Sequence, residues 1–238
     1  MRIFLMLKHL IWMTLGRFPL TLSLFKLASS TIRQGIGIVG KPTDIVIEGY
    51  PRSANTFAVA AFQFAQGVPK NIAHHIHGAA QIKLGVIYQI PTIVLIRAPK
   101  AAITSLLIRQ PYLSIRQAIV DYINFYEAVS PLKQQVVIAQ FDQVIADFGK
   151  VIQDVNVKFG TDFKVFEHTP DRIEQVYRLV EQMDLKNRNQ GTVSENAVAR
   201  PSEARAQLKI QVLERITQAK YQALLQQAEA VYAQFIEP

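Results

Sequence analysis

Short apolar runs alternate along the chain with segments whose apolar positions recur every three or four residues. Residues 44–48, 91–96 and 135–141 are runs rich in β-branched residues, in which polar positions do not alternate. Such runs are typical of strands buried on both faces, as in a parallel sheet. We expect a fourth, shorter strand at residues 163–166.

Helical periodicity fills the segments between these runs. Helices are expected at residues 54–66, 79–88, 99–109, 114–129, 142–159 and 170–183, with Pro99 and Ser114 at two of the starts. Residues 202–235 predict a long C-terminal helix, or two helices with a kink between them. The polar stretch 185–200 is the candidate for a mobile loop. Strand and helix alternate, so the fold class expected is α/β.

The composition fits one globular unit. The chain has 238 residues, of which 50% are hydrophobic and 18% charged, and it contains no cysteine. Disulfides, thiolate catalysis and cysteine-based metal sites are therefore excluded, and a cytoplasmic location is expected. We expect residues 43–238 to form a single α/β domain, preceded by a separate leader over residues 1–42.

This leader is apolar and purely basic. It carries Arg2, Lys8, Arg17, Lys26, Arg33 and Lys41 and no acidic residue. Arg17 and Lys26 divide the apolar run into pieces far shorter than the roughly 20 residues that cross a bilayer. Three readings stay open: a helix packed on the domain, an amphipathic segment in weak contact with a membrane surface, and a targeting segment.

Basic residues dominate the first half of the chain. Residues 1–120 hold 13 Lys and Arg but only two acids, Asp44 and Glu48, whereas residues 121–238 hold 13 against 16. Between residues 49 and 120 there is no acid at all. This charge distribution is typical of a pocket for a polyanion.

The turn after the first strand is the candidate for an anion-binding loop. A strand, a tight turn and a helix place free backbone N–H groups around an anion. Compared with the nucleotide-binding pattern G-x-x-x-x-G-K-[ST], Gly49 and Thr56 match, but Ala54 and Asn55 replace the second Gly and the Lys. The missing lysine argues against ATP or GTP.

The strand at 91–96 supports this interpretation. It ends in Arg97, where many nucleoside-triphosphatases have a magnesium-binding Asp. Arginine grips phosphate with two parallel hydrogen bonds. Asp142, after the 135–141 strand, is the one fallback ligand for magnesium, and it keeps a P-loop kinase open as an alternative.

Two segments resemble the sulfotransferase family. Residues 50–57, YPRSANTF, are similar to its 5′-phosphosulfate loop, Y-P-K/R-S-G-T-T-W, and residues 97–105, RAPKAAITS, are similar to its 3′-phosphate motif, R-x-P-x-x-x-x-x-S. The order and separation of the two segments also agree. The resemblance covers about residues 43–166 and implies a P-loop-like three-layer sandwich, with a central parallel sheet flanked by helices.

The resemblance further implies a donor, 3′-phosphoadenosine 5′-phosphosulfate (PAPS), and a product, 3′-phosphoadenosine 5′-phosphate (PAP), without a metal. The 5′-phosphosulfate is expected on Arg52, Ser53, Ala54, Asn55, Thr56 and Phe57, and the 3′-phosphate on Arg97 and Ser105. The chain departs from the family at Ala54 and Asn55, and it lacks the late glycine-rich segment that covers the 3′-phosphate. Arg188, Arg200 and Arg205 are candidate substitutes for that segment, and Arg200 is included in the expected donor site.

Three histidines lie between the two motifs, at positions 74, 75 and 77. They could ligate a metal, pack in the core or act as a base, since a neutral imidazole can take a proton from an acceptor hydroxyl. In the family, the base lies in a K-T-H-like segment upstream of the 3′-phosphate arginine. When the two segments are aligned, His77 is the expected base and His75 stands at the position of the family's lysine. Arg52 could take over the role of that lysine, which is to assist the leaving phosphate.

The function expected from these features is sulfuryl transfer to a hydroxyl or amine on a small molecule, glycan or lipid, without a nucleic-acid partner. A kinase and a non-catalytic binder of an anionic nucleotide or lipid headgroup are the alternatives. Asp121, Tyr122 and Tyr126 could line the acceptor site or simply pack.

Overall fold

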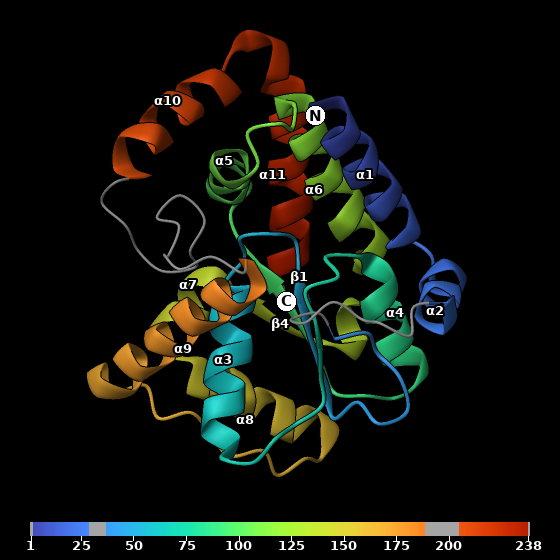
Figure 1. The fold of residues 1–238 in the computed structure, drawn as a ribbon, viewed down its shortest axis with the longest axis vertical. Coiled ribbons are helices and arrows are strands. Elements are labelled where there is room, and N and C mark those ends of the chain that lie inside the picture. Colours follow the sequence, from blue (N-terminus) through green and yellow to red (C-terminus); the bar gives the residue numbers. More distant parts are fainter. Residues whose placement is uncertain (1, 29–36, 189–204, 238) are drawn as a thin grey trace.

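A four-stranded parallel sheet forms the centre of the computed structural model, which describes residues 2–28, 37–188 and 205–237. The strands are β1 (Ile45–Gly49), β2 (Ile72–His74), β3 (Thr92–Ile96) and β4 (Val137–Gln140), in the order β2-β1-β3-β4. Helices cover both faces of this sheet (Figure 1). The expected α/β class and three-layer arrangement are therefore confirmed.

The apolar runs divide their side chains between the two helical layers. Ile93 and Leu95 of β3 pack with α3 (Asn55–Gln66), α8 (Phe148–Phe159) and α9 (Pro170–Arg188). Val94 and Ile96 pack on the opposite face, with a layer that includes α4 (Ala79–Ile87), α5 (Pro99–Arg109), α6 (Ile115–Val129) and α11 (Gln222–Ile236). Because each strand is covered on both sides, its sequence shows no polar alternation.

Several helix boundaries follow the predicted signals. α5 begins at Pro99, and the Ser114 hydroxyl accepts a hydrogen bond from the Gln117 N–H (3.1 Å) to cap α6. The helical segment expected at 142–159 forms two helices, α7 (Phe141–Ala146) and α8. The break falls at Asp147, whose carboxylate accepts from the Lys150 N–H (3.1 Å) and so starts a new helix.

The strand predicted at residues 163–166 is wrong, and β2 was not predicted. Two side chains make the hydrogen bonds that a neighbouring strand would make. The Gln66 amide pairs with the N–H and the carbonyl of Lys164, and the Asn156 amide pairs with the N–H and the carbonyl of Phe163. This segment therefore stays extended but unpaired. β2 is only three residues long and is defined by its pairing with β1.

The C-terminal part follows the second of the two expected arrangements, two helices with a break between them, whereas the N-terminal part forms two helices instead of one. The C-terminal part forms α10 (Ala206–Ile216), a short 3-10 turn at Ala219–Tyr221, and α11. The N-terminal part forms α1 (Arg2–Leu15) and α2 (Pro19–Ala28). Of the loop expected at 185–200, residues 185–188 belong to α9, and the remainder lies outside the described residues.

The N-terminal helices pack on the rest of the protein. His9 of α1 contacts Asp121 of α6 (Nε2–Oδ2 2.8 Å), and Leu22 of α2 is buried in a small apolar cluster beside α4. The turn between the helices is held by the Ala80 N–H, which donates to the Gly16 carbonyl (2.9 Å). None of the helices within the described ranges is both long and apolar enough to cross a membrane.

Candidate functional site

The turn between β1 and α3 lies at the carboxyl end of the sheet, where the N-terminus of α3 begins. Arg52 (φ 72°) and Ala54 (φ 71°) both adopt the left-handed conformation. Tyr50 holds the turn in place through two hydrogen bonds. Its buried hydroxyl donates to the Ala118 carbonyl (2.8 Å), and its backbone carbonyl accepts from the Asn55 side-chain amide (3.1 Å). Glycine would adopt the left-handed conformation of Ala54 without strain, which agrees with the glycine at the matching position of the loop that residues 50–57 resemble.

The two sequence motifs meet at this turn. Arg52 Nε donates to the Ser105 hydroxyl (2.9 Å), and Arg97 donates to the Arg52 carbonyl (3.1 Å). The Arg97 guanidinium carbon also lies 3.8 Å from the centre of the Phe141 ring, which holds its plane. Residues from the β1–α3 turn, the end of β3 and the middle of α5 thus form one cluster.

One further arginine lies near this cluster. Arg205, only 6% exposed, immediately precedes α10. Burial lowers the pKa of Arg97, the charge of Arg205 lowers it further, and Asp142 opposes both effects. Two cations held this close disfavour each other, and a bound anion would offset that repulsion.

The side chains of the other two candidate arginines lie outside what the structure describes. Arg200 lies outside the described residues. Arg188 ends α9, but its side chain is also outside what the structure describes. Arg205 is therefore the one of the three candidates that the structure places near Arg97.

The three histidines form a cluster beside the turn. His75 Nε2 lies 3.0 Å from the Thr56 hydroxyl, and its Nδ1 is in hydrogen-bond contact with Nδ1 of His74. Only one proton fits between those two nitrogens. Burial lowers the pKa of His75 well below its usual range, and the charges of His74, His77 and Arg109 add to this shift. His75 is thus neutral near pH 7.

His77 is held differently. Its Nδ1 donates to the Gly49 carbonyl (2.9 Å) and lies 3.4 Å from a Glu48 carboxylate oxygen. A ring that donates through Nδ1 keeps the lone pair of Nε2 for another proton. The His77 side chain is 24% exposed, whereas Glu48 is fully buried. The backbone of His77 is also in the left-handed region (φ 54°).

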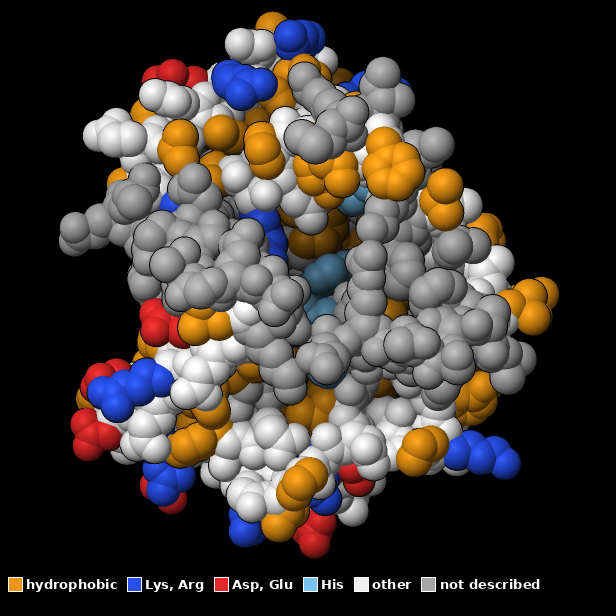
Figure 2. Space-filling model, viewed as in Figure 1, with side chains coloured by type: hydrophobic (Ala, Val, Ile, Leu, Met, Phe, Trp, Pro, Cys, Tyr) orange, Lys and Arg blue, Asp and Glu red, His pale blue; other side chains and the backbone are white. Residues whose placement is uncertain are grey.

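Glu48 is a site residue that the sequence analysis missed. Its carboxylate accepts from the Gly49 N–H (3.2 Å) and the Ile76 N–H (2.9 Å), and it therefore ties the histidine segment to β1. The signal was present in the sequence, because Glu48 is an acid that directly follows the apolar residues 45–47 of the predicted strand. Figure 2 shows histidine side chains at the bottom of a hollow in the molecular surface, with a basic side chain at its edge.

The α6 residues that could have lined an acceptor site are packing residues. The Tyr122 hydroxyl donates to the Arg97 carbonyl and the Tyr126 hydroxyl to the Leu95 carbonyl (2.8 Å each). Burial raises the pKa of both tyrosines. Asp121 contacts His9 of α1. Ser53 is buried too, with its hydroxyl 3.4 Å from that of Tyr126.

Asp142, the fallback magnesium ligand, is exposed at the start of α7. Within the described part of the chain, no group of three or more His, Asp or Glu side chains is arranged to hold a metal ion.

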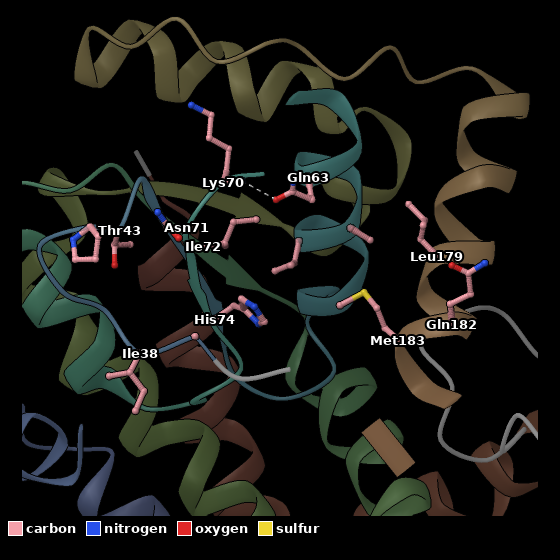
Figure 3. A pocket seen from close by; sticks show the side chains of 14 residues that line it. Ile38, Thr43, Gln63, Lys70, Asn71, Ile72, His74, Leu179, Gln182 and Met183 are labelled. Carbon is pink, nitrogen blue, oxygen red and sulfur yellow. Dashed lines mark hydrogen bonds between the residues drawn. The ribbon is translucent and has the colours of Figure 1, made fainter. Parts of the chain in front are cut away.

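A cavity of about 750 Å³ adjoins the histidine cluster through His74. Its walls are mainly apolar and come from α3, β2, α9 and the segment before β1, with Val59, Ile72, Leu179 and Met183 among them. Figure 3 shows the ring of His74 among these side chains, while the amine of Lys70 points away from them. The cavity can hold an apolar molecule next to the cluster.

Comparisons with known proteins find a distant structural likeness. No protein-family model matches the chain, and no curated protein matches it. Among solved structures, the chain is similar to mouse sulfotransferase SULT7A1 complexed with PAP, with a TM-score of 0.42 and 13% identity over 80% of this chain and 84% of the mouse chain. A likeness at this level assigns no activity to the chain.

Proposed function

We propose that this protein is a sulfotransferase, which moves a sulfuryl group from PAPS to a hydroxyl or amine acceptor and releases PAP. The observation that carries the proposal is the meeting of Arg52, Arg97 and Ser105 at the β1–α3 turn, beside a histidine whose Nε2 is left to accept a proton. The resemblance of the two motifs to the family's donor loops supports PAPS as the anion.

Each end of the donor has a matching group. The 5′-phosphosulfate lies on the turn over residues 52–57 and at the N-terminus of α3, where backbone N–H groups and the helix dipole favour negative charge. The 3′-phosphate lies against Arg97 and Ser105, with Arg205 close by. Because Arg52 donates to Ser105 without a ligand, donor binding exchanges this contact for contacts to the donor's oxygens.

The transfer needs one base and one site for the leaving charge. His77 Nε2 takes the proton of the acceptor hydroxyl as its oxygen bonds to sulfur, while Gly49 and Glu48 hold the ring. The bond between sulfur and the bridging oxygen breaks, and its electron pair stays on the 5′-phosphate of PAP. Arg52 and the turn stabilise that charge.

His75 has a positioning role in this scheme. Its lowered pKa keeps it neutral, so it does not supply a cation to the leaving phosphate. Through its contact with the Thr56 hydroxyl, it orients that group toward the donor. The apolar walls of the cavity at His74 favour an acceptor with an apolar body.

The test measures release of PAP from PAPS with 2-naphthol or dodecanol as the acceptor. His77→Ala should lower the rate about 10²–10⁴-fold, the range typical of a general base. His75→Ala should keep part of the rate. His77→Ala should bind PAP nearly as well as the wild type, because the donor contacts lie elsewhere, whereas His75→Ala should bind PAP more weakly, because Thr56 loses the group that orients it.

Three outcomes contradict parts of this proposal. Activity of His77→Ala within a few-fold of the wild type would remove His77 from the mechanism. Loss of activity in His75→Ala alone would assign the role of base to His75 instead of His77. Tight PAP binding without turnover of either acceptor would favour the non-catalytic binder, and release of ADP from ATP with magnesium would favour the kinase.

A further inference from the structure

Exposed hydrophobic side chains gather on the two N-terminal helices. In α1, the α1–α2 turn and α2, six large apolar side chains are between 37% and 70% exposed: Phe4, Met6, Ile11, Phe18, Leu20 and Leu24. Figure 2 shows hydrophobic side chains along the right side of the molecule, where Figure 1 places α1 and α2. Apolar patches of this kind mark interaction surfaces.

This apolar side is not the side that packs on the domain. Packing uses His9, which contacts Asp121, and Leu22, which is 2% exposed. A side chain at Gly78 would collide with Gly16, since its Cβ would lie 2.4 Å from the Gly16 carbonyl oxygen. The helices are thus fixed by one face, and a second apolar face points outward.

The basic sequence of this segment and the exposed Arg17 identify its partner. Residues 1–43 contain six basic residues and no acid, and Arg17 is exposed beside Phe18 in the turn. A second copy of this chain is a poor partner, because a two-fold interface brings the same cations face to face. An anionic bilayer offers both negative charge and an apolar interior.

We propose that α1, α2 and the turn between them form a docking surface for an anionic lipid bilayer, on which the helices lie without crossing it. Phe18 and Leu20 enter the interface between headgroups and acyl chains, and Arg17 contacts the headgroups. The surface joins the candidate site through the contact between Gly16 and Gly78, the residue after His77. This inference does not depend on the proposed reaction.

The experiment measures co-sedimentation of the full chain with phosphatidylcholine vesicles that contain or lack phosphatidylserine. Binding should require phosphatidylserine and should fall as salt rises from about 0.1 M to about 0.5 M. Trp12 of α1, the only tryptophan of the chain, supplies a fluorescence signal for the same titration.

Substitutions on the α1–α2 surface should weaken vesicle binding according to the apolar area or the charge that they remove. Phe18→Gln with Leu20→Gln should lower the affinity about tenfold or more, because both side chains leave the apolar interface. Arg17→Gln should lower it about fivefold, the loss of one cation at an anionic surface. Val157→Gln with Ile210→Gln is the matched control, since these exposed apolar residues lie on α8 and α10.

The proposal is overturned if the chain does not bind phosphatidylserine vesicles, or if it binds pure phosphatidylcholine equally well. It also fails if the α1–α2 variants bind like the control while their unfolding free energies match the wild type. A dimer in light scattering that Phe18→Gln with Leu20→Gln dissociates would instead assign this face to a second copy.

Discussion

The neutral histidines beside the turn make the stability of this protein sensitive to acid. Burial lowers the pKa of His75 well below 6.5 and that of His74 below 6.5, although Glu48 opposes the shift of His74. In the unfolded chain, both rings take up a proton near pH 6.5. The stability that these neutral rings provide is therefore fully present above pH 6.5 and is lost as the pH falls below it.

The magnitude follows from proton linkage. For one histidine that stays neutral in the folded state, lowering the pH to about 5.5 costs about 1.4 kcal/mol of unfolding free energy. His75, with the larger shift, is the histidine to which this loss applies. Because a single proton bridges its Nδ1 and that of His74, protonation of both rings breaks this contact as well.

The assay compares urea unfolding of the wild type and of His75→Asn at about pH 7.5 and about pH 5.5. The wild type should lose about 1.4 kcal/mol more than the variant between the two pH values. Every other titrating group is present in both proteins, so the difference isolates the cluster. Equal losses in the two proteins would show that His75 is not held neutral in the folded state.

Two further predictions concern the anion site. Arg97→Met keeps an unbranched side chain at this position but removes the charge, and in calorimetry it should weaken PAP binding about 10- to 150-fold, the loss of a charge-assisted pair worth about 1.5–3 kcal/mol. AMP, which lacks the 3′-phosphate, should bind almost unchanged, and equal losses for both nucleotides would assign Arg97 to the 5′ end or to the fold. Ala54→Gly should raise the unfolding free energy by up to about 1 kcal/mol, because relief of the left-handed strain exceeds the added flexibility of the unfolded chain. Lower stability of Ala54→Gly in urea unfolding would show that Ala54 is not strained.

Local signals were enough to predict much of the fold. α5 runs from Pro99 to Arg109 as expected, because a proline start and an apolar face are both local features. The strand expected at 163–166 failed for a non-local reason, since Gln66, about 100 residues away in the chain, satisfies the backbone there. β2 exists because β1 pairs with it, and three residues carry too little pattern to show this.

The contacts of the candidate site also fall into those that the sequence could predict and those that it could not. The meeting of Arg52, Arg97 and Ser105 could be expected, because the carboxyl ends of parallel strands share one edge of the sheet. The tie between Glu48 and Ile76 could not, because the strand β2 that precedes Ile76 was not predicted. The contact between His9 and Asp121 could not, because no motif indicates that α1 packs on α6. Such contacts depend on how the layers pack.

The measurement that tests the account most directly is a calorimetric titration of the wild-type protein with PAP, AMP and ATP with magnesium, the first two in the presence of a chelator. The account predicts that PAP binds at least about tenfold more tightly than AMP, because the 3′-phosphate gains Arg97 and Ser105. It also predicts that ATP with magnesium binds more weakly than PAP. Equal affinities for PAP and AMP, or tighter binding of ATP with magnesium, would contradict the assignment of this turn to a 3′-phosphorylated donor.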